Sequence, residues 1–417
     1  MEEWSATSSE AVREALRKAN LARLRVIPRG MGTRPISGPF AHGAEPTIAL
    51  RTTGLDALES IDAEELVMTA QAGASLTAVA AALEPHGLFL PPLLDPRQPG
   101  TLGGLFSDPR ESPLQPRLGA VRDHVLGIEA VRGDGVAFRA GGRVVKNVTG
   151  YDITRFLCGA RGEWAVITRI HWRLLHRPAV TQRMRFAVDT ARALWDGLDA
   201  LRRSSCEPLA VTLTTPANVA APGATSTIVE VLEAGTNVTY RARLERARRA
   251  AVNAGWGVVE TEPLSNAGHP AIDSAMPTTP ASRARPVTPT ATTHSPALDL
   301  RIRLPYSAWS RFLADRPPGL LWQAVYPFAH FGLARLARTD VWPGEPLRAL
   351  RARVAALGGS IALETIPTDC PLDADPWGRG PSCGATEQES LQRITHALRR
   401  AWDSRGVLAC SVDRSRA

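Results

Sequence analysis

The chain has 417 residues, and 44% of them are hydrophobic, which is enough for two domains with sizeable cores. Its 49 Lys and Arg against 41 Asp and Glu give a net charge of +8, and because the basic residues are scattered they argue against a nucleic-acid-binding stripe. Five cysteines stand far apart without a C-x-x-C pair, which disfavours a metal site and fits a reducing cytoplasm. The first residues lack the pattern of a signal peptide, and no apolar run reaches membrane-spanning length.

Apolar periodicity predicts alternating helices and strands in the first 178 residues. Segment 7–23 begins with capping-box spacing and has an apolar stripe, so we expect a helix. Gly133-Asp134-Gly135 is typical of a hairpin turn. The proline-rich stretch 108–117 is expected to be an exposed loop. Other expected helices are 55–61, the segment from Ser75 to Gly87, and 151–158; expected strands are 24–27, 47–50, 66–72, 88–90, 125–132, 136–139 and 164–175.

The pattern changes after Pro178, where a strand–helix–strand–strand–helix order favours an antiparallel sheet with helices on one face. The stretch 265–298 holds six Pro, six Thr, four Ser and seven Ala, so we expect an insertion without a packed core. The sequence therefore predicts two domains, 1–178 and 179–417. Expected strands of the second are 183–188, 210–214, 227–232, 300–304, 320–326, 331–334 and 360–363; expected helices are 191–203, 240–254, 346–356 and 391–402.

Two short glycine-rich segments suggest an anion site. Residues 26–34 read V-I-P-R-G-M-G-T-R, and residues 101–105 read T-L-G-G-L. Glycine lets the backbone approach a ligand closely, and successive amides in such a turn form a concavity that holds phosphate. The amides of Gly30 to Thr33 would be donors, and Arg29 and Arg34 would add positive charge at the rim. The alternative is a tight turn between two strands.

The third glycine-rich patch is residues 141–152, G-G-R-V-V-K-N-V-T-G-Y-D, followed by C-G-A-R-G at 158–162. Gly159 and Gly162 would let a turn approach a flat ligand. An ordinary strand–turn–helix connection is the alternative reading of this patch.

Together, these patches resemble the FAD-binding domain of the vanillyl-alcohol oxidase / p-cresol methylhydroxylase (PCMH) class. The resemblance rests on the ordered series P-R-G-x-G-T-R, A-G-A-S-L, T-L-G-G, R-D-H-V-L-G, K-N-V-T-G-Y-D and C-G-A-R-G, and covers about residues 24–178. Within the class, the run around K-N-V-T-G-Y-D is most similar to the FAD-binding subunits of glycolate oxidase. The resemblance implies an α+β fold: a PCMH-type FAD-binding domain of two α/β subdomains, followed by a smaller cap domain with an antiparallel sheet and helices.

The resemblance also implies which residues contact a noncovalently bound FAD. The two glycine-rich segments would wrap the pyrophosphate, the two prolines would lie along the approach to the isoalloxazine ring, and the residues after 158 would lie along the ribityl and adenine side. Lys146 would stabilise reduced flavin, with a solvated surface charge as the alternative. These residues are Arg29, Gly30, Met31, Gly32, Thr33, Arg34, Pro91, Pro92, Thr101, Leu102, Gly103, Gly104, Lys146, Gly159, Gly162 and Ile167.

The function implied by the resemblance is that of an FAD-dependent oxidoreductase subunit that oxidises glycolate, or another 2-hydroxy acid, to the 2-oxo acid. Its partners would be a larger flavin subunit and an iron–sulfur subunit, and it would be cytoplasmic, reaching the inner face of the cell membrane only through the complex. No catalytic residue and no metal ligand is assigned, because a lone His124 or His171 is typical of a structural histidine.

Two alternatives remain. The sequence departs from the family pattern in two places: residues 108–117 replace a glycine-rich turn, and R-G-E-W at 161–164 replaces the more usual acidic-Gly-Thr-Leu. These departures suggest a non-catalytic scaffold subunit with a decayed flavin site. A self-sufficient FAD-linked oxidase of another substrate is the third reading.

Overall fold

The computed structural model describes residues 2–33, 46–91, 100–143, 151–214, 227–235, 239–264, 297–315, 320–337, 344–364 and 385–408. The expected insertion at 265–298 therefore lies outside the described residues, except for its last two. Within the described part, no helix is both long enough and apolar enough to cross a membrane.

A small parallel sheet opens the chain, with the strand order β1(Glu2–Ser5), β3(Thr47–Arg51), β2(Arg25–Arg29). Helix α1(Ser9–Ala22) connects β1 to β2 and buries Val12, Leu16 and Ala19. Its first turn is capped by Ser8, whose hydroxyl accepts a hydrogen bond from the Ala11 amide at 3.1 Å. The helix expected at 7–23 and the strands expected at 24–27 and 47–50 are confirmed.

A five-stranded antiparallel sheet follows, in the order β4(Leu58–Asp62), β5(Val67–Gln71), β9(Val166–Arg173), β7(Val125–Val131), β8(Ala137–Gly141). The helix expected at 55–61 is wrong, because β4 pairs with β5 there, and a seven-residue stretch is too short for periodicity to decide. Around this sheet lie α2(Leu76–Leu83), β6(Leu88–Phe89), α3(Leu102–Ser107), α4(Gln115–Leu118), α5(Val121–His124), α6(Ile153–Leu157) and β10(Leu175–His176).

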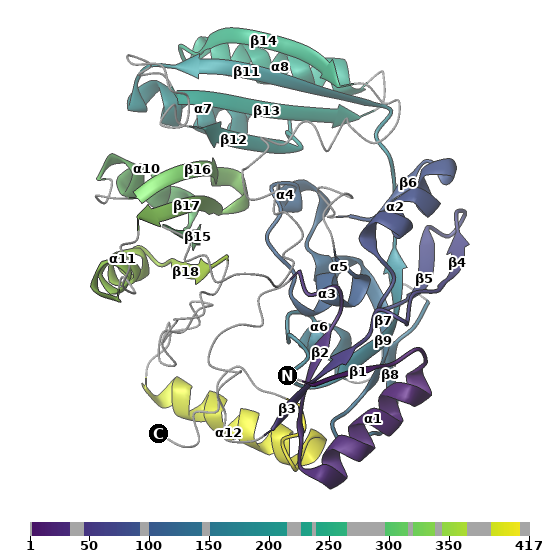
Figure 1. Ribbon diagram of the computed structural model, residues 1–417. Helices are drawn as coiled ribbons and strands as arrows, with labels where there is room; N and C mark the ends of the chain where they lie inside the picture. Colours follow the sequence, from purple (N-terminus) through teal and green to yellow (C-terminus); the bar gives the residue numbers. More distant parts are fainter. Residues whose placement is uncertain are drawn as a thin grey trace.

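An eight-stranded antiparallel sheet forms most of the second half (Figure 1). Its order is β14(Gly257–Leu264), β11(Val180–Val188), β13(Thr227–Gly235), β12(Ala210–Thr214), β16(Leu320–Tyr326), β17(Phe331–Ala337), β15(Ala297–Arg303), β18(Ser360–Leu363). The helices α7(Ala191–Arg203), α8(Thr239–Asn253), α10(Tyr306–Ala314) and α11(Gly344–Ala356) contribute to its core, in which Phe186, Trp309 and Phe312 are fully buried. The α+β expectation is confirmed.

The proline-rich stretch 108–117 is not an exposed loop. Ser112 and Leu114 are buried, and Leu114 packs with Leu209, Ala210 and Leu232 of the large sheet. The apolar side chain of Leu114 and the ion pairs formed by its neighbours bring this segment to the large sheet, so it joins the two halves of the molecule.

The end of the chain returns to the N-terminal half, although the domain prediction places it at 179–417. After α12(Ala385–Trp402), the Trp402 ring packs edge-on to Phe138, with ring centroids 5.3 Å apart. The Val26 amide donates to the Val407 carbonyl at 2.6 Å, and Leu408 bridges to Val26 in parallel register. In Figure 1, the C-terminal end of α12 accordingly lies at the end of the molecule that holds α1 and β8, away from the large sheet.

Asp403 holds this return in place. The residue is 3% exposed, and its carboxylate accepts hydrogen bonds from the Val407 and Leu408 amides at 2.8 and 2.9 Å. Replacing it leaves two buried donors unsatisfied, so we expect Asp403→Ala to lower the free energy of unfolding by about 1–3 kcal/mol. Urea unfolding measures this, with Asp56→Ala at an exposed position as the control. Equal stabilities of the two variants would contradict the role of Asp403.

Glu233 makes stability depend on pH. It is fully buried, neither carboxylate oxygen has a hydrogen-bond partner among the described residues, and the Arg243 guanidinium is 3.9 Å away. Burial raises the pKa of Glu233 from 4.5 to about 8, and Arg243 only partly opposes this. Between these values the folded state keeps a proton that the unfolded chain releases.

Stability should therefore fall as pH rises from 4.5 to about 8, by up to about 1.4 kcal/mol per pH unit from this group. Glu233→Gln should remove that slope and unfold at a higher urea concentration than the wild type at pH 8. Urea midpoints at pH 6 and pH 8 test this, with Glu64→Gln on the surface as the control. A wild-type slope in Glu233→Gln would show that another group causes it.

Candidate functional site

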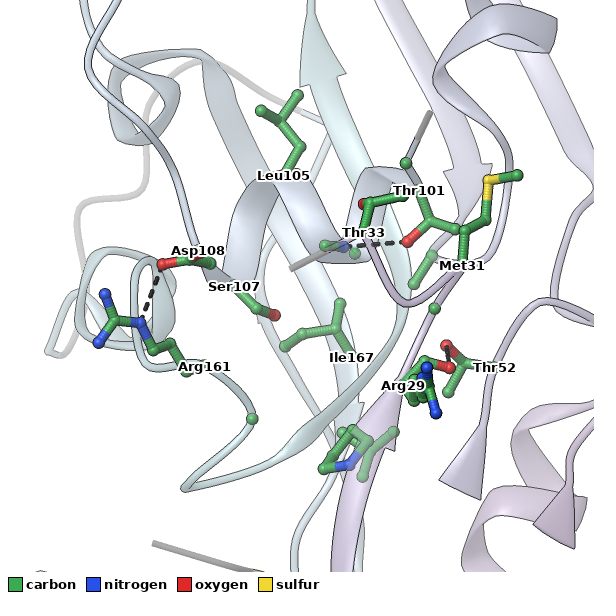
Figure 2. A pocket seen from close by; sticks show the side chains of 18 of the residues that line it. Arg29, Met31, Thr33, Thr52, Thr101, Leu105, Ser107, Asp108, Arg161 and Ile167 are labelled. Atoms are coloured by element: carbon green, nitrogen blue, oxygen red, sulfur yellow. Dashed lines mark hydrogen bonds and ion pairs between the residues drawn. The ribbon is translucent and has the colours of Figure 1, made fainter. Parts of the chain in front are cut away.

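A cleft open to solvent lies where the small parallel sheet meets the five-stranded sheet, with about 1120 Å³ of empty space when the solvent at its mouth is included. Three backbone segments form its walls: the loop after β2, the start of α3, and the turn that leads into β9 (Figure 2). Ile27, Thr52, Ala72, Leu76, Val166 and Ile167 add side chains from the strands and from α2.

The loop after β2 supplies hydrogen-bond donors. Gly30, Met31, Gly32 and Thr33 all line the cleft, and among the described residues none of their amides donates a hydrogen bond. Gly32 has φ +73, a left-handed conformation that favours glycine, and a Cβ there would lie 2.7 Å from Arg29 Nη2. Successive unpaired amides beside a guanidinium are what an anion needs.

Arg29 supplies positive charge beneath this loop. Its Nη1 lies 3.4 Å from the Glu3 carboxylate, while its Nε is buried without a hydrogen-bond partner in the described part of the chain. A buried N–H of a charged group without a partner is costly unless a ligand satisfies it. The donor set of Arg29 and the glycine loop therefore fits a phosphate-bearing group.

The second glycine-rich segment differs from its prediction. Thr101 caps α3, and the amides that follow are already used: Leu102 donates to the Ala74 carbonyl at 3.0 Å, Gly103 to the Ala72 carbonyl at 2.7 Å, and Gly104 to Thr101 Oγ1 at 3.1 Å. It is the start of a helix and not a second nest of free amides. Its glycines allow α3 to pack closely, since a Cβ on Gly103 would lie 2.9 Å from the Ala72 carbonyl oxygen.

The turn before β9 forms the third wall. Gly162 has φ +78 and lies against Pro28, where a Cβ would come within 2.9 Å of the proline ring. Arg161 has φ +52, its amide donates to the Ser107 carbonyl at 2.8 Å, and its Nε pairs with Asp108 Oδ1 at 2.9 Å. Figure 2 shows this ion pair across the cleft from Arg29.

The structure brings most of the predicted site residues together, but not all. Those that line the cleft are Arg29, Gly30, Met31, Gly32, Thr33, Thr101, Gly103, Gly104, Gly162 and Ile167. Leu102, Gly159 and Pro91 do not line the cleft. Leu102 is fully buried in the core, Gly159 donates its amide to the Phe106 carbonyl, and the Pro91 carbonyl accepts from Trp172 Nε1 at 3.3 Å. Arg34, Pro92 and Lys146 lie outside the described residues.

Sequence reasoning missed several lining residues, among them Thr52, Ser107, Asp108 and Arg161. Asp108 and Arg161 carried a signal, because each begins a stretch that departs from the expected family motifs, 108–117 and 161–164. The Thr52 hydroxyl, just after β3, donates to the Arg29 carbonyl at the end of β2 at 3.3 Å, a contact that no local pattern reveals.

The two singled-out histidines do not line the cleft. His124 is 1% exposed with Nε2 2.6 Å from the Leu118 carbonyl oxygen, and burial lowers its pKa. His171 Nδ1 lies 3.0 Å from the Thr69 hydroxyl, and burial lowers its pKa as well. Both have structural partners. No group of His, Cys, Asp and Glu in the described ranges could hold a metal ion.

Comparison with known proteins defines the class. Residues 4–141 match the FAD binding domain family, so this part of the chain is an FAD binding domain and its cofactor is FAD. The expected PCMH-type FAD-binding fold is confirmed. A solved structure of alkyldihydroxyacetonephosphate synthase superposes with a TM-score of 0.73 at 12% identity, over 99% of this chain and 76% of that one, which shows the likeness of the fold.

Among curated proteins, the chain is similar to glycolate oxidase subunit GlcE of Escherichia coli (strain K12), with 38% identity over 136 residues, 32% of this chain and 38% of that protein. It is also similar to glycolate oxidase subunit GlcD of Bacillus subtilis (strain 168), with 29% identity over 45% of this chain and 38% of that protein. D-lactate dehydrogenase of Archaeoglobus fulgidus is 36% identical over 40% of this chain and 37% of its own length. The matches span less than half the length of these relatives.

Close packing between Gly30 and Thr101 makes it possible to test whether the loop after β2 belongs to the FAD site. A Cβ at Gly30 would lie 2.5 Å from Thr101 Oγ1, so Gly30→Val must push the loop away from α3. Overpacking of this kind costs about 1–3 kcal/mol, so we expect FAD to bind roughly tenfold more weakly or worse in a fluorescence-quenching titration. The control is Gly142→Val, where an added Cβ meets nothing within 4 Å. Unchanged FAD binding by Gly30→Val would exclude this loop from the FAD site.

Proposed function

We propose that this chain is the FAD-binding subunit of a complex that oxidises 2-hydroxy acids, with glycolate as the substrate. One observation carries the proposal: an FAD binding domain presents a cleft where four consecutive amides and a buried arginine N–H have no partner in the described part of the chain. Similarity to the glycolate oxidase subunits GlcD and GlcE and to D-lactate dehydrogenase supports the substrate class.

In this proposal the loop Gly30 to Thr33 binds the pyrophosphate of FAD. Its amides donate to the phosphate oxygens, and Arg29 neutralises part of their charge. Thr101, Gly103 and Gly104 shape the opposite wall without free amides, and Gly162, Val166 and Ile167 offer an apolar surface to the flat parts of the cofactor. Arg34, Pro91, Pro92, Lys146 and Gly159 remain assigned by the resemblance alone, and Leu102 contributes by core packing.

When bound, FAD would supply the hydride acceptance that oxidises the C–H bond of the hydroxy acid. This chain's residues would bind and orient the cofactor and exclude water from it. Neither His124 nor His171 lines the cleft, so the chain offers no histidine base there in its described part, and the catalytic residue stays unassigned. A larger flavin subunit would hold the substrate chemistry, and an iron–sulfur subunit would take the electrons.

The complex would operate in the cytoplasm, with contact to the inner face of the cell membrane made by its other subunits. This placement follows from the resemblance and from the sparse cysteines of the sequence.

A second candidate is a scaffold subunit that no longer holds FAD. It is favoured by the start of α3, where the amides of Leu102, Gly103 and Gly104 donate hydrogen bonds within the protein and are not available to a ligand. It is also favoured by the stretch 108–117, which joins the two halves of the molecule.

The visible spectrum of the purified chain separates the two candidates. We expect a flavin spectrum, with one FAD per chain released by denaturant, because the amide cradle and Arg29 fit a pyrophosphate. Glycolate should bleach it only when the larger subunit is present, and D-lactate serves as the alternative substrate. A colourless chain that still binds the larger subunit would support the scaffold candidate. Bleaching by glycolate without a partner would contradict the proposed division of labour.

A further inference from the structure

Five charged side chains connect the segment after α3 to the large sheet, and we call them the ionic bridge. Arg110 and Glu111 belong to that segment, Arg301 and Arg303 to β15, and Glu364 follows β18. Figure 1 shows β15 and β18 at one end of the large sheet. The bridge thus joins residues separated by about half of the chain.

The contacts alternate in charge. Arg110 Nη1 pairs with Glu364 Oε2 at 2.6 Å, and Arg301 Nη1 lies 3.2 Å from Glu111 Oε2 and donates to the Glu111 carbonyl at 3.0 Å. Arg301 Nε also pairs with Glu364, and Arg303 Nε pairs with Glu111. Each glutamate of the bridge is therefore held by two guanidinium groups, one or both from the opposite half.

Because Arg301 and Glu364 of the ionic bridge are largely buried, loss of their ion pairs is costly. The Arg301 side chain is 8% exposed and that of Glu364 is 15% exposed, so neither charge is well solvated. Burial alone would raise the pKa of Glu111, but Arg301 and Arg303 hold it below its ordinary value. A buried charge that loses its partner is strongly unfavourable, whereas exposed pairs contribute little. The position of 110–111 is thus fixed by the large sheet.

The bridge is adjacent to the cleft along the chain and in space. Ser107 and Asp108 line the cleft and precede Arg110 by two or three residues. Both are tied to Arg161 of the turn before β9, Ser107 through its carbonyl and Asp108 through its carboxylate, so the three form one wall. A second pocket, open to solvent, is lined by Asp108 and Arg161 on one side and by Arg303 and Glu364 on the other.

We propose that the ionic bridge is a positioning element for FAD: it fixes residues 107–111 against the large sheet and thereby sets the cleft wall formed by Ser107, Asp108 and Arg161. This rests on the proposed function, in which the cleft is the FAD site. Coupling between two sites is reciprocal, so FAD in the cleft also stabilises the seating of the large sheet on the N-terminal half.

Glu111→Gln tests the bridge because it removes one carboxylate and keeps the side-chain volume. We expect its dissociation constant for FAD to rise about tenfold, the size typical of coupling between sites. In the double variant with Asp108→Asn the two effects should be non-additive, since both substitutions release the same wall. The control is Glu59→Gln, which removes a carboxylate from an ion pair within the five-stranded sheet and should change FAD affinity less than about twofold.

Trypsin gives the reciprocal readout, because it cleaves after Arg110. We expect FAD to slow the appearance of the fragment ending at Arg110 in the wild type and in Glu59→Gln, and to lose that effect in Glu111→Gln. If Glu111→Gln does not fold, Arg110→Gln takes its place in the FAD titration only, because it removes the tryptic site; it leaves Arg301 paired with both glutamates. It should weaken FAD binding in the same direction.

The outcomes are distinct. Wild-type protein that binds no FAD would end the proposed function. Wild-type protein that binds FAD, with bridge variants that are folded and bind it equally well, would overturn the positioning role alone. Additive effects of Glu111→Gln and Asp108→Asn would overturn it as well, because the bridge and the cleft wall would then act independently.

Discussion

The close approach of the loop after β2 to the start of α3 is the constraint on which the cleft depends. Gly30 lies against the Thr101 side chain, and there is no room for a Cβ between them. This contact joins the small parallel sheet to the five-stranded sheet, whose core holds α3 through Leu102 and Phe106. The loop amides can remain unpaired because the backbone around them is held by β2, by β3 and by the cap of α3. A cavity lined by main-chain donors is thus produced by packing that extends well beyond it.

The wall across the cleft from this loop is also held in place by residues outside the cleft. Asp108 and Arg161 form that wall, and Arg161 occupies a left-handed conformation that is strained for a residue with a side chain. Its amide and its guanidinium are both held by residues 107–108, so the strain is balanced locally. Those residues are in turn anchored by Leu114 and by the ionic bridge at the large sheet. The large sheet therefore helps to fix the position of this cleft wall through a short stretch of chain, although no strand of the large sheet lines the cleft.

The sequence predicted the features that neighbouring residues determine, such as helix caps and tight turns. The capping signal at the start of α1, the cap at Ser75 and the Gly133–Gly135 turn each specify their own element. The structure has the cap at Ser75 and the turn where they were expected, and it caps α1 at Ser8, one residue after the start of the predicted capping box. The loop Gly30 to Thr33 was found because glycine at a strand end has a strong local meaning. What failed depends on distant partners. Most of the segment 55–61 became part of a strand through pairing with β5, and 108–117 became buried through a sheet whose strands come much later in the chain.

The second glycine-rich segment shows why a motif does not by itself assign a role. The amides of T-L-G-G were expected to donate hydrogen bonds to a ligand. In the structure Gly103 allows α3 to pack closely on Ala72, and the amides of Leu102 and Gly103 donate hydrogen bonds to the carbonyls of Ala74 and Ala72. The anion-binding capacity of the cleft therefore rests on one loop and on Arg29, whose Nε is a buried donor without a partner among the described residues. A site with so few charge-compensating groups is sensitive to where its walls stand, because a small displacement cannot be offset by other donors. This explains physically why the ion pairs that hold 107–111 to the large sheet would matter to a cofactor that none of them needs to touch.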